Sequence, residues 1–461
     1  MNRAYYLNIP IILILCLLYG AKVTQGGYTD EIQPYKENSR YWQYQGEPVL
    51  LVGGTKDDNL FQIPDLEEHL NLLTRVGGNY IRNTMSARDK GNVHPFEREG
   101  NLYNLDRWNE EYWNRFERML KLTQAREIIV QIELWAQWDF SQKSYPYSAW
   151  NPKNNVTFTR SNTRLKEHYG KIFRTKKKHD FFTSVPRLSN DTLLLEYQKN
   201  FVEKILSYSL RYGHVLYCVT NEIFEQYSPE WGWYWARYVK DMAQTLGKTA
   251  YVTEMFQSHN IRGKHHKASL DHPEIYDYVE LSQNSTYSNS TRGDYHWDNL
   301  VYVHDYISAH PRPINHTKTY GDDPRAVKSF WRSIIGGAAS MRFHRPNIGL
   351  GLNEKVQASL KAVRKLESLA KMWEVNPFMD LLQNRTRDEA YVAAEIGKKY
   401  VLYFPDGGSV KLNLRDEQGT FLLRWINIHT GNWGDEMIIR GGSTVSLAAP
   451  SRGGWIAVLL N

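Results

Sequence analysis

Residues 215–222 read VLYCVTNE, an apolar run that ends in the polar pair Asn221 and Glu222. The run is short and rich in β-branched and aromatic residues, which predicts a buried β-strand. In parallel α/β proteins the residues that carry chemistry follow the carboxyl ends of the strands. Asn221 and Glu222 therefore stand where a functional site is expected, provided that the rest of the chain supplies the other strands.

Seven further runs of the same kind alternate with helical patterns along the 461 residues. Apolar residues recur at helical spacing after Pro64 and again from Trp108 to Leu120, and five later segments show comparable patterns. The predicted strands are residues 49–53, 79–84, 128–134, 215–221, 250–254, 278–282, 314–320 and 338–344. Eight such units predict an α/β fold, a (β/α)8 TIM barrel of parallel strands and crossover helices.

The pattern changes after Met372. Short alternating segments separated by glycine-rich turns predict a small all-β sandwich domain. The expected strands are residues 390–394, 400–404, 409–414, 421–427, 437–439, 443–447 and 455–460. We therefore predict a barrel domain over residues 27–372 and a β-sandwich over residues 373–461.

The first 26 residues resemble a secretory signal peptide. Arg3 precedes an apolar core at residues 9–18 that is too short to cross a membrane, and small residues follow it. The protein is therefore expected to be secreted or periplasmic, without a membrane partner once the signal is cleaved. Cys218 would then be the only cysteine, so stability must come from the core and not from an intrachain disulfide.

The formal net charge is +7, and much of the basic character lies in two runs, residues 171–179 and 262–267. Such runs are often solvated loops, but they can also attract an acidic polymer. For an exported protein, an anionic polysaccharide or oligosaccharide is the expected partner rather than nucleic acid. The chain has no phosphate-binding loop, dinucleotide fingerprint or helical pair of zinc-binding histidines, so neither a cofactor nor a metal is expected.

Carboxylates at the strand ends suggest hydrolysis of a glycosidic bond, which commonly uses one protonated and one ionised carboxyl group. Glu222 is the candidate acid/base, with the raised pKa that this role requires. Glu254, at the end of the next strand, is the leading second carboxylate because adjacent strands lie about 4.8 Å apart. Glu133, at the end of the third strand, competes with Glu254 for that role.

Further polar and aromatic residues at the strand ends are expected to bind substrate. Arginine and lysine among them favour a uronic or sulfated sugar, because guanidinium groups match oxyanions in pairs. The candidates are Asn221, Arg82, Trp135, Lys318, Tyr320, Arg342 and His344.

Residues 41–346 resemble the apiosidase-like TIM-barrel glycoside hydrolases. The similar features are YQGEPV at residues 44–49 leading into GGT at 53–55, the pair Asn221 and Glu222, and RPI at 312–314. Residues 372–460 resemble the collagen-binding-type β domain found behind such barrels, through EIGKKY at 395–400, YFPDGG at 403–408 and Arg424-Trp425 followed by Thr430-Gly431.

The resemblance implies that Glu222 is the acid/base and that strand seven carries a nucleophilic glutamate. This chain has Lys318 where that glutamate is expected. The nucleophile could lie on another strand, water could attack directly, or the site could have lost hydrolysis. Two other functions therefore stay open: a non-catalytic glycan-binding or matrix-binding protein, and a polysaccharide lyase with Tyr320 or His344 as its base.

Overall fold

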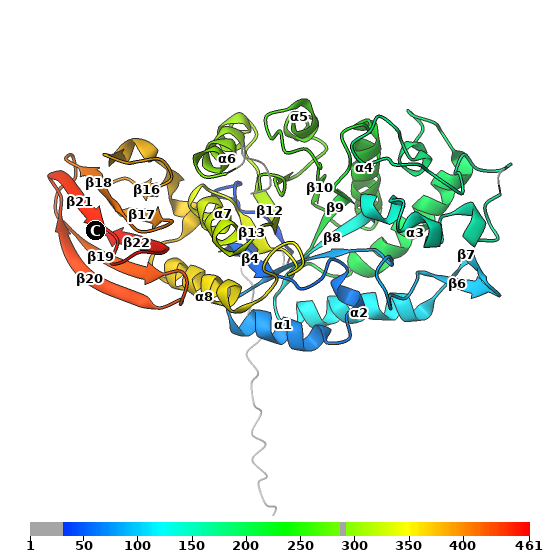
Figure 1. Cartoon of the computed structure of the whole chain (residues 1–461), viewed down its shortest axis with the longest axis horizontal. Helices are drawn as coiled ribbons and strands as arrows, with labels where there is room; N and C mark the ends of the chain where they lie inside the picture. The colour runs from blue at the N-terminus through cyan, green and yellow to red at the C-terminus, as the bar shows by residue number, and fades with distance from the viewer. Residues whose placement is uncertain (1–30, 160, 286–291) are drawn as a thin grey trace, which may run out of the picture.

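The computed structural model describes residues 31–159, 161–285 and 292–461 (Figure 1). The predicted signal peptide lies outside these residues. All eight predicted barrel strands are present. They are β4 (Leu51–Gly54), β5 (Tyr80–Thr84), β8 (Ile129–Ala136), β9 (Val215–Asn221), β10 (Val252–Thr253), β11 (Val279–Glu280), β12 (Ile314–Thr319) and β13 (Ser340–Phe343).

These strands form two four-stranded parallel sheets, in the orders β5-β8-β9-β10 and β11-β12-β13-β4. Single backbone hydrogen bonds join the sheets at both edges. Asn79 N donates to Val52 O over 2.9 Å, and Asp277 N donates to Val252 O over 2.9 Å. The order of the strands in space therefore follows their order in the chain, and all eight carboxyl ends face one side.

Helices cover the outer faces of the two sheets (Figure 1). They are α1 (Leu66–Arg75), α2 (Glu110–Gln124), α3 (Thr192–Ser209), α4 (Glu230–Thr245), α5 (Lys264–Leu270), α6 (Asp294–Tyr306), α7 (Asp323–Ile335) and α8 (Glu354–Leu369). In α2, Tyr112, Phe116 and Leu120 are buried at the predicted helical spacing. The helix begins after Asn109, whose side chain accepts from Glu111 N and caps the first turn.

Several segments differ from the sequence prediction. The basic run at residues 262–267 leads into helix α5, although we expected a loop there. Residues 96–108 form an unpredicted hairpin, β6 (Phe96–Glu99) and β7 (Leu102–Trp108). The long connection after β8 contains only short 3-10 turns in its described part, as expected for a segment that forms the rim of a site.

A small antiparallel sheet precedes the barrel strands, with strands β1 (Gln33–Pro34), β2 (Trp42–Tyr44) and β3 (Glu47–Val49). Trp42 is fully buried, and its Nε1 donates to Asn315 Oδ1 over 2.9 Å. Asn315 is the second residue of β12 and lies far from the carboxyl ends of the strands. The sheet thus covers the amino-terminal side of the barrel strands and leaves the carboxyl side free.

The C-terminal domain has the predicted all-β architecture. One sheet contains β14 (Asn376–Pro377), β16 (Tyr391–Glu395), β17 (Lys399–Phe404), β22 (Trp455–Leu460), β19 (Thr420–Asn427) and β20 (Trp433–Arg440), in that order. The other contains β15 (Leu382–Gln383), β18 (Ser409–Leu414) and β21 (Ser443–Ala448). Alternate side chains of β17 therefore point to different cores: Val401 and Tyr403 join the barrel core, whereas Leu402 packs between the sheets.

Helices α7 and α8 pack against the larger of these sheets (Figure 1). The guanidinium of Arg332 in α7 is buried and donates twice to Asp388 Oδ1, from Nε over 3.0 Å and from Nη2 over 2.7 Å. Tyr391 OH donates to the same oxygen over 2.7 Å. The two domains are therefore joined by a continuous apolar core and by an ion pair whose arginine is buried. None of the helices in the described ranges is long and apolar enough to cross a membrane.

Candidate functional site

A cavity of about 490 Å³ opens at the carboxyl ends of the barrel strands. Five residues chosen from the sequence line it together: Asn221, Glu222, Lys318, Tyr320 and His344. They come from the ends of β9, β12 and β13, which are far apart in the sequence and are brought together by the parallel sheets. We call this space the Glu222 cavity.

Glu222 follows the last residue of β9 and has a left-handed backbone, with φ of 64°. A non-glycine residue in this conformation is strained, and such strain is commonly retained where a side chain must be aimed precisely. Its carboxylate is held by several donors. Trp138 Nε1 donates to Oε2 over 2.6 Å, while Gln283 Nε2, over 3.0 Å, and the Tyr320 hydroxyl donate to Oε1.

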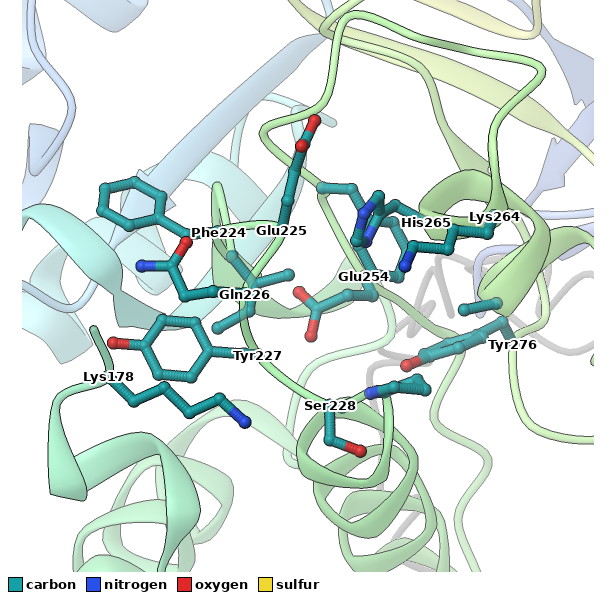
Figure 2. A pocket seen from close by; sticks show the side chains of 15 residues that line it. Lys178, Phe224, Glu225, Gln226, Tyr227, Ser228, Glu254, Lys264, His265 and Tyr276 are labelled. Carbon is teal, nitrogen blue, oxygen red and sulfur yellow. The ribbon is translucent and has the colours of Figure 1, made fainter. Parts of the chain in front are cut away.

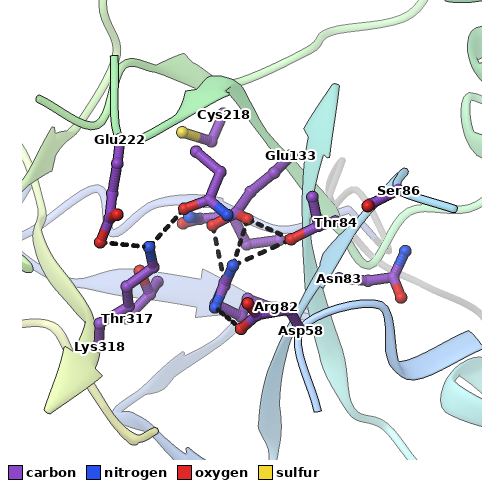
Figure 3. Close-up of polar contacts among 12 residues, drawn as sticks. Asp58, Arg82, Asn83, Thr84, Ser86, Glu133, Cys218, Glu222, Thr317 and Lys318 are labelled. Carbon is purple, nitrogen blue, oxygen red and sulfur yellow. Dashed lines mark hydrogen bonds and ion pairs between the residues drawn. The ribbon is translucent and has the colours of Figure 1, made fainter. Parts of the chain in front are cut away.

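Lys318 completes this arrangement, with its Nζ 2.7 Å from Glu222 Oε1 (Figure 3). The ammonium also donates to Asn221 Oδ1. The pairing of β12 with β13 shifts between His316 and Thr319, so the strand is irregular where Lys318 lies. The residue in the place of the implied strand-seven glutamate is thus a cation that pairs directly with Glu222.

The protonation state expected for Glu222 is wrong. Burial by itself raises the pKa of this carboxyl group, but the charge of Lys318 and the hydrogen bonds from Lys318, Tyr320 and Trp138 outweigh it and lower the pKa to about 2. Glu222 is therefore ionised at neutral pH. We expected a protonated acid, because position in a strand does not reveal which donors the fold brings to a carboxylate.

Glu133 does not line the Glu222 cavity and has its own partners (Figure 3). It accepts from Arg82 Nε over 2.8 Å, from Arg82 Nη2 over 2.6 Å and from Thr84 Oγ1 over 2.6 Å, and all three residues are buried. Arg82 in turn donates to Asp58 Oδ1 over 2.6 Å, and Asp58 does line the cavity. Glu133 and Arg82 thus hold Asp58 in place from behind the cavity.

Asp58 is surrounded by several cationic side chains. Arg82, Arg88 and Arg345 lie within 3.1 Å of its oxygens, and His344 Nε2 lies at 3.8 Å. Burial acts to raise the pKa of this carboxyl group, but these charges prevail and hold it well below its usual range. Asp58 is therefore a second ionised carboxylate in the wall of the cavity, and it orders the arginines around it.

Three of the proposed substrate-binding residues lie elsewhere, and one of them is Arg82, which is buried behind the cavity. Arg342 is fully buried and donates to the Thr317 carbonyl and the Thr55 hydroxyl, and desolvation lowers its pKa to about 9. Trp135 lines an adjoining cavity. The prediction that the substrate-binding residues share one cavity is therefore wrong for Arg82, Trp135 and Arg342, because their side chains turn into the core.

Glu254 lies in a separate cavity, next to α4 and α5 (Figure 2). Its Oε1 accepts from Thr220 N over 2.8 Å and from Met255 N over 3.0 Å, and Oε2 faces Gly232 of α4. Burial raises the pKa of Glu254 well above its usual value. We expected Glu254 beside Glu222 from the strand spacing, but the direction of the side chain places it in a different cavity.

The sequence prediction missed several residues of the site, among them Trp138 and Arg88. Trp138 comes from the long connection after β8, and Arg88 from the segment after β5. Arg88 binds Asp139 over 2.8 Å as well as Asp58, so it joins two loops at the cavity wall. A search restricted to the carboxyl ends of the strands does not include either residue. The only available signal was the length of the segment that contains Trp138.

Comparisons with known proteins identify the fold. No family model and no curated protein matches this sequence. A solved glycoside hydrolase family 5 protein from Bacteroides vulgatus ATCC 8482 is 12% identical, with a TM-score of 0.64 and coverage of 94% of each chain. Another structure, described as a glycoside hydrolase, is 11% identical, with a TM-score of 0.63 and coverage of 94% of this chain and 97% of its own.

The chain therefore shares the fold of these solved glycoside hydrolases over nearly its whole length. At this level of identity the likeness establishes the fold, and the chemistry must be argued from the site.

Proposed function

We propose that this protein is a glycoside hydrolase that acts on an acidic polysaccharide at the Glu222 cavity. The observation that carries the proposal is Glu222 itself. An ionised carboxylate with a strained backbone stands at the carboxyl ends of the strands, inside an open cavity, and is held by four side chains. This proposal takes the barrel to be closed, as the hydrogen bonds at both sheet edges support.

The low pKa gives Glu222 a particular role. Its carboxylate can attack the anomeric carbon, or it can take a proton from a water molecule that attacks. The bond to the leaving oxygen then breaks, and that oxygen needs a proton. Tyr320 donates a hydrogen bond to Glu222 and Lys318 forms an ion pair with it, so these two are the candidate proton donors.

The charges of the cavity support an acidic substrate. Lys143 and Arg174 line it with exposed side chains, and Arg88 and Arg345 stand around Asp58. Guanidinium and ammonium groups at the rim attract carboxylate or sulfate groups, and their effect weakens with added salt. A uronic or sulfated sugar is thus the proposed unit of the substrate.

The shape of the site supports a chain rather than a single sugar. A second cavity of about 430 Å³ shares Arg88, Asp89, Lys143 and Ser144 with the Glu222 cavity. At its edge stands Tyr147, which is 76% exposed. An exposed aromatic ring offers an apolar face on which a sugar can stack. The two cavities together form a path for several sugar units.

Replacing Glu222 by glutamine tests the proposal. We expect Glu222→Gln to abolish the release of reducing ends from uronic and sulfated polysaccharides, while Glu222→Asp retains part of it. Glu196→Gln, at an exposed position of α3, is the matched control and should behave as the wild type. Thermal melting establishes that each variant is folded. Unchanged turnover by Glu222→Gln would remove the central claim.

The ion pair between Lys318 and Glu222 favours a second candidate, a glycan-binding protein without catalysis. A cation in contact with the carboxylate opposes the protonated state that an acid/base glutamate requires. Binding to the same polysaccharides without any new reducing ends would support this candidate. An unsaturated product that absorbs in the ultraviolet would instead indicate elimination by a lyase.

We also propose three finer assignments on the strength of sequence resemblance. The barrel belongs to the apiosidase-like subtype, the β domain is of the collagen-binding type, and the N-terminal segment directs the protein to a secreted or periplasmic location. Pull-down of residues 373–461 on insoluble polysaccharide and on collagen tests the second assignment. N-terminal sequencing of the exported protein tests the third.

A further inference from the structure

A cavity of about 410 Å³ lies beside the segment 223–229, which directly follows Glu222. Residues of α4 and α5, together with Glu254 and Tyr276, complete its lining (Figure 2). We propose that this cavity binds a single small acidic sugar, a uronate, at a site distinct from the Glu222 cavity. The proposal concerns binding alone and does not depend on hydrolysis at Glu222.

Two buried polar groups stand in the lining with unused hydrogen-bonding capacity. Tyr276 is fully buried, and its hydroxyl finds no hydrogen-bond partner within the described ranges. Glu254 uses Oε1 for two backbone amides, while Oε2 has only a weak contact of 3.4 Å with Thr220 Oγ1. An unpaired buried hydroxyl is costly, so a ligand that supplies hydroxyl groups would stabilise this arrangement.

Gly232 in α4 is what allows the two oxygens to stand together. A Cβ at this position would lie 2.5 Å from the Tyr276 hydroxyl and 2.7 Å from Glu254 Oε2. Both distances are shorter than any real Cβ contact, so a side chain here would displace one of the two groups. A glycine in the first turn of a helix thus keeps a carboxyl group and a phenol at the same point of the cavity.

The rim of the cavity carries a net positive charge, because two lysines stand there against the single carboxylate of Glu225. Lys178 and Lys264 line it with exposed side chains, and no ion pair engages either of them in the part of the chain that the structure describes. Their amino groups point toward the space between them (Figure 2). The walls also include Ile223 and Phe256, which are apolar. Cations at the entrance, apolar walls and hydrogen-bonding groups inside fit the carboxylate, the C–H face and the hydroxyls of a uronate.

The position of the cavity gives its ligand a route to Glu222. The ligand would contact the segment 223–229, and Ile223 is the next residue after Glu222. Ile223 also forms an isolated parallel bridge with Phe256, another residue of the lining. Occupation of the cavity would therefore hold the backbone that sets the direction of Glu222.

Calorimetric titration of the whole protein with glucuronate, glucose and sulfate tests the proposal. We expect glucuronate to bind more tightly than either of the others, since glucose lacks the carboxylate and sulfate lacks the hydroxyls. Tyr276→Phe and Lys264→Ala should each weaken the binding of glucuronate by about 3- to 10-fold. Tyr276→Phe removes a hydroxyl without a partner, so the variant should fold normally, which thermal melting verifies.

One control variant locates the binding site. Lys411→Ala, which removes an exposed lysine of the β domain, should bind glucuronate as the wild type does. Hydrogen exchange of the amides in 223–229 should slow when glucuronate is bound. The proposal is overturned if Tyr276→Phe binds glucuronate unchanged or if glucose binds equally well.

Discussion

Lys318 Nζ lies 2.7 Å from Glu222 Oε1, so a buried ammonium on β12 faces the carboxylate at the end of β9. Both side chains are less than a tenth exposed. The pair determines the charge of Glu222 and therefore the role that this residue can play. Five predictions test this pair, the parts of the fold that support it and the proposed substrate path.

Lys318→Met should raise the pKa of Glu222. Without the ammonium, burial is no longer opposed by a charge, so the pKa should rise from about 2 by about 2 units or more. Carbon-13 NMR of labelled glutamate carboxyl groups, in wild type and variant, measures this directly. Lys143→Met removes an exposed cation of the same cavity and should leave the Glu222 pKa within half a unit. A pKa that stays near 2 in Lys318→Met would show that the other donors suffice.

The pH dependence of activity should follow from the same pair. In the wild type Glu222 is ionised above about pH 2, so turnover should not fall between pH 7 and pH 4 through protonation of this group. In Lys318→Met any remaining turnover should fall in that window as the carboxylate takes up a proton. Initial rates over this pH range, with folding verified at each pH, provide the measurement. A wild-type profile with an acidic limb near pH 5 would contradict an ionised Glu222.

Asp388→Asn should destabilise the protein through Arg332. The Arg332 guanidinium is buried against the β domain and would lose its charged partner, at a cost of about 2 to 3 kcal/mol in the free energy of unfolding. Asp406→Asn breaks the exposed pair with Lys328, which joins the same helix to the same domain, and should cost less than about 0.5 kcal/mol. Denaturant unfolding of both variants compares the two ion pairs. Equal effects would mean that burial of Arg332 contributes nothing.

Gly53→Ala should prevent β4 and β5 from packing together. A Cβ at position 53 would lie 1.9 Å from the backbone carbonyl of Tyr80, which cannot move without displacing β5. We expect a loss of about 3 kcal/mol or more, or failure to fold. In the control Gly170→Ala, the new Cβ would meet only the flexible Lys177 amine at 3.5 Å and should be neutral. A stable, active Gly53→Ala would argue against the contact between the two sheets.

Tyr147→Ala should weaken binding of long substrates more than that of short ones. Loss of a stacking ring at the far end of the path should raise KM for a polysaccharide by about 5-fold and leave a disaccharide substrate unaffected. Tyr306→Ala, which removes a 39% exposed ring from α6, is the control. An equal change in KM for both substrate lengths would indicate that Tyr147 acts at the Glu222 cavity instead.

The barrel strands and the longer strands of the β domain were predictable because local pattern sets them. The segment 215–221 coincides with β9, and residues 409–414 and 455–460 coincide with β18 and β22. Helix α5 was missed because the helix is short and its first turn contains Lys264, His265 and Lys267, so its sequence shows a basic run and no clear apolar periodicity. The shared cavity was predictable for Asn221, Lys318, Tyr320 and His344, since the parallel strands place their carboxyl ends on one side.

The sequence by itself determined that a glutamate stands at the end of β9, in a protein of alternating strands and helices with a β domain behind it. Only the tertiary structure decided that this glutamate is ionised and that Glu254 is not beside it. The reason is physical. A strand pattern specifies where a backbone ends, whereas a pKa and a side-chain direction depend on groups such as Lys318 and Gly232, which folding brings in from elsewhere in the chain.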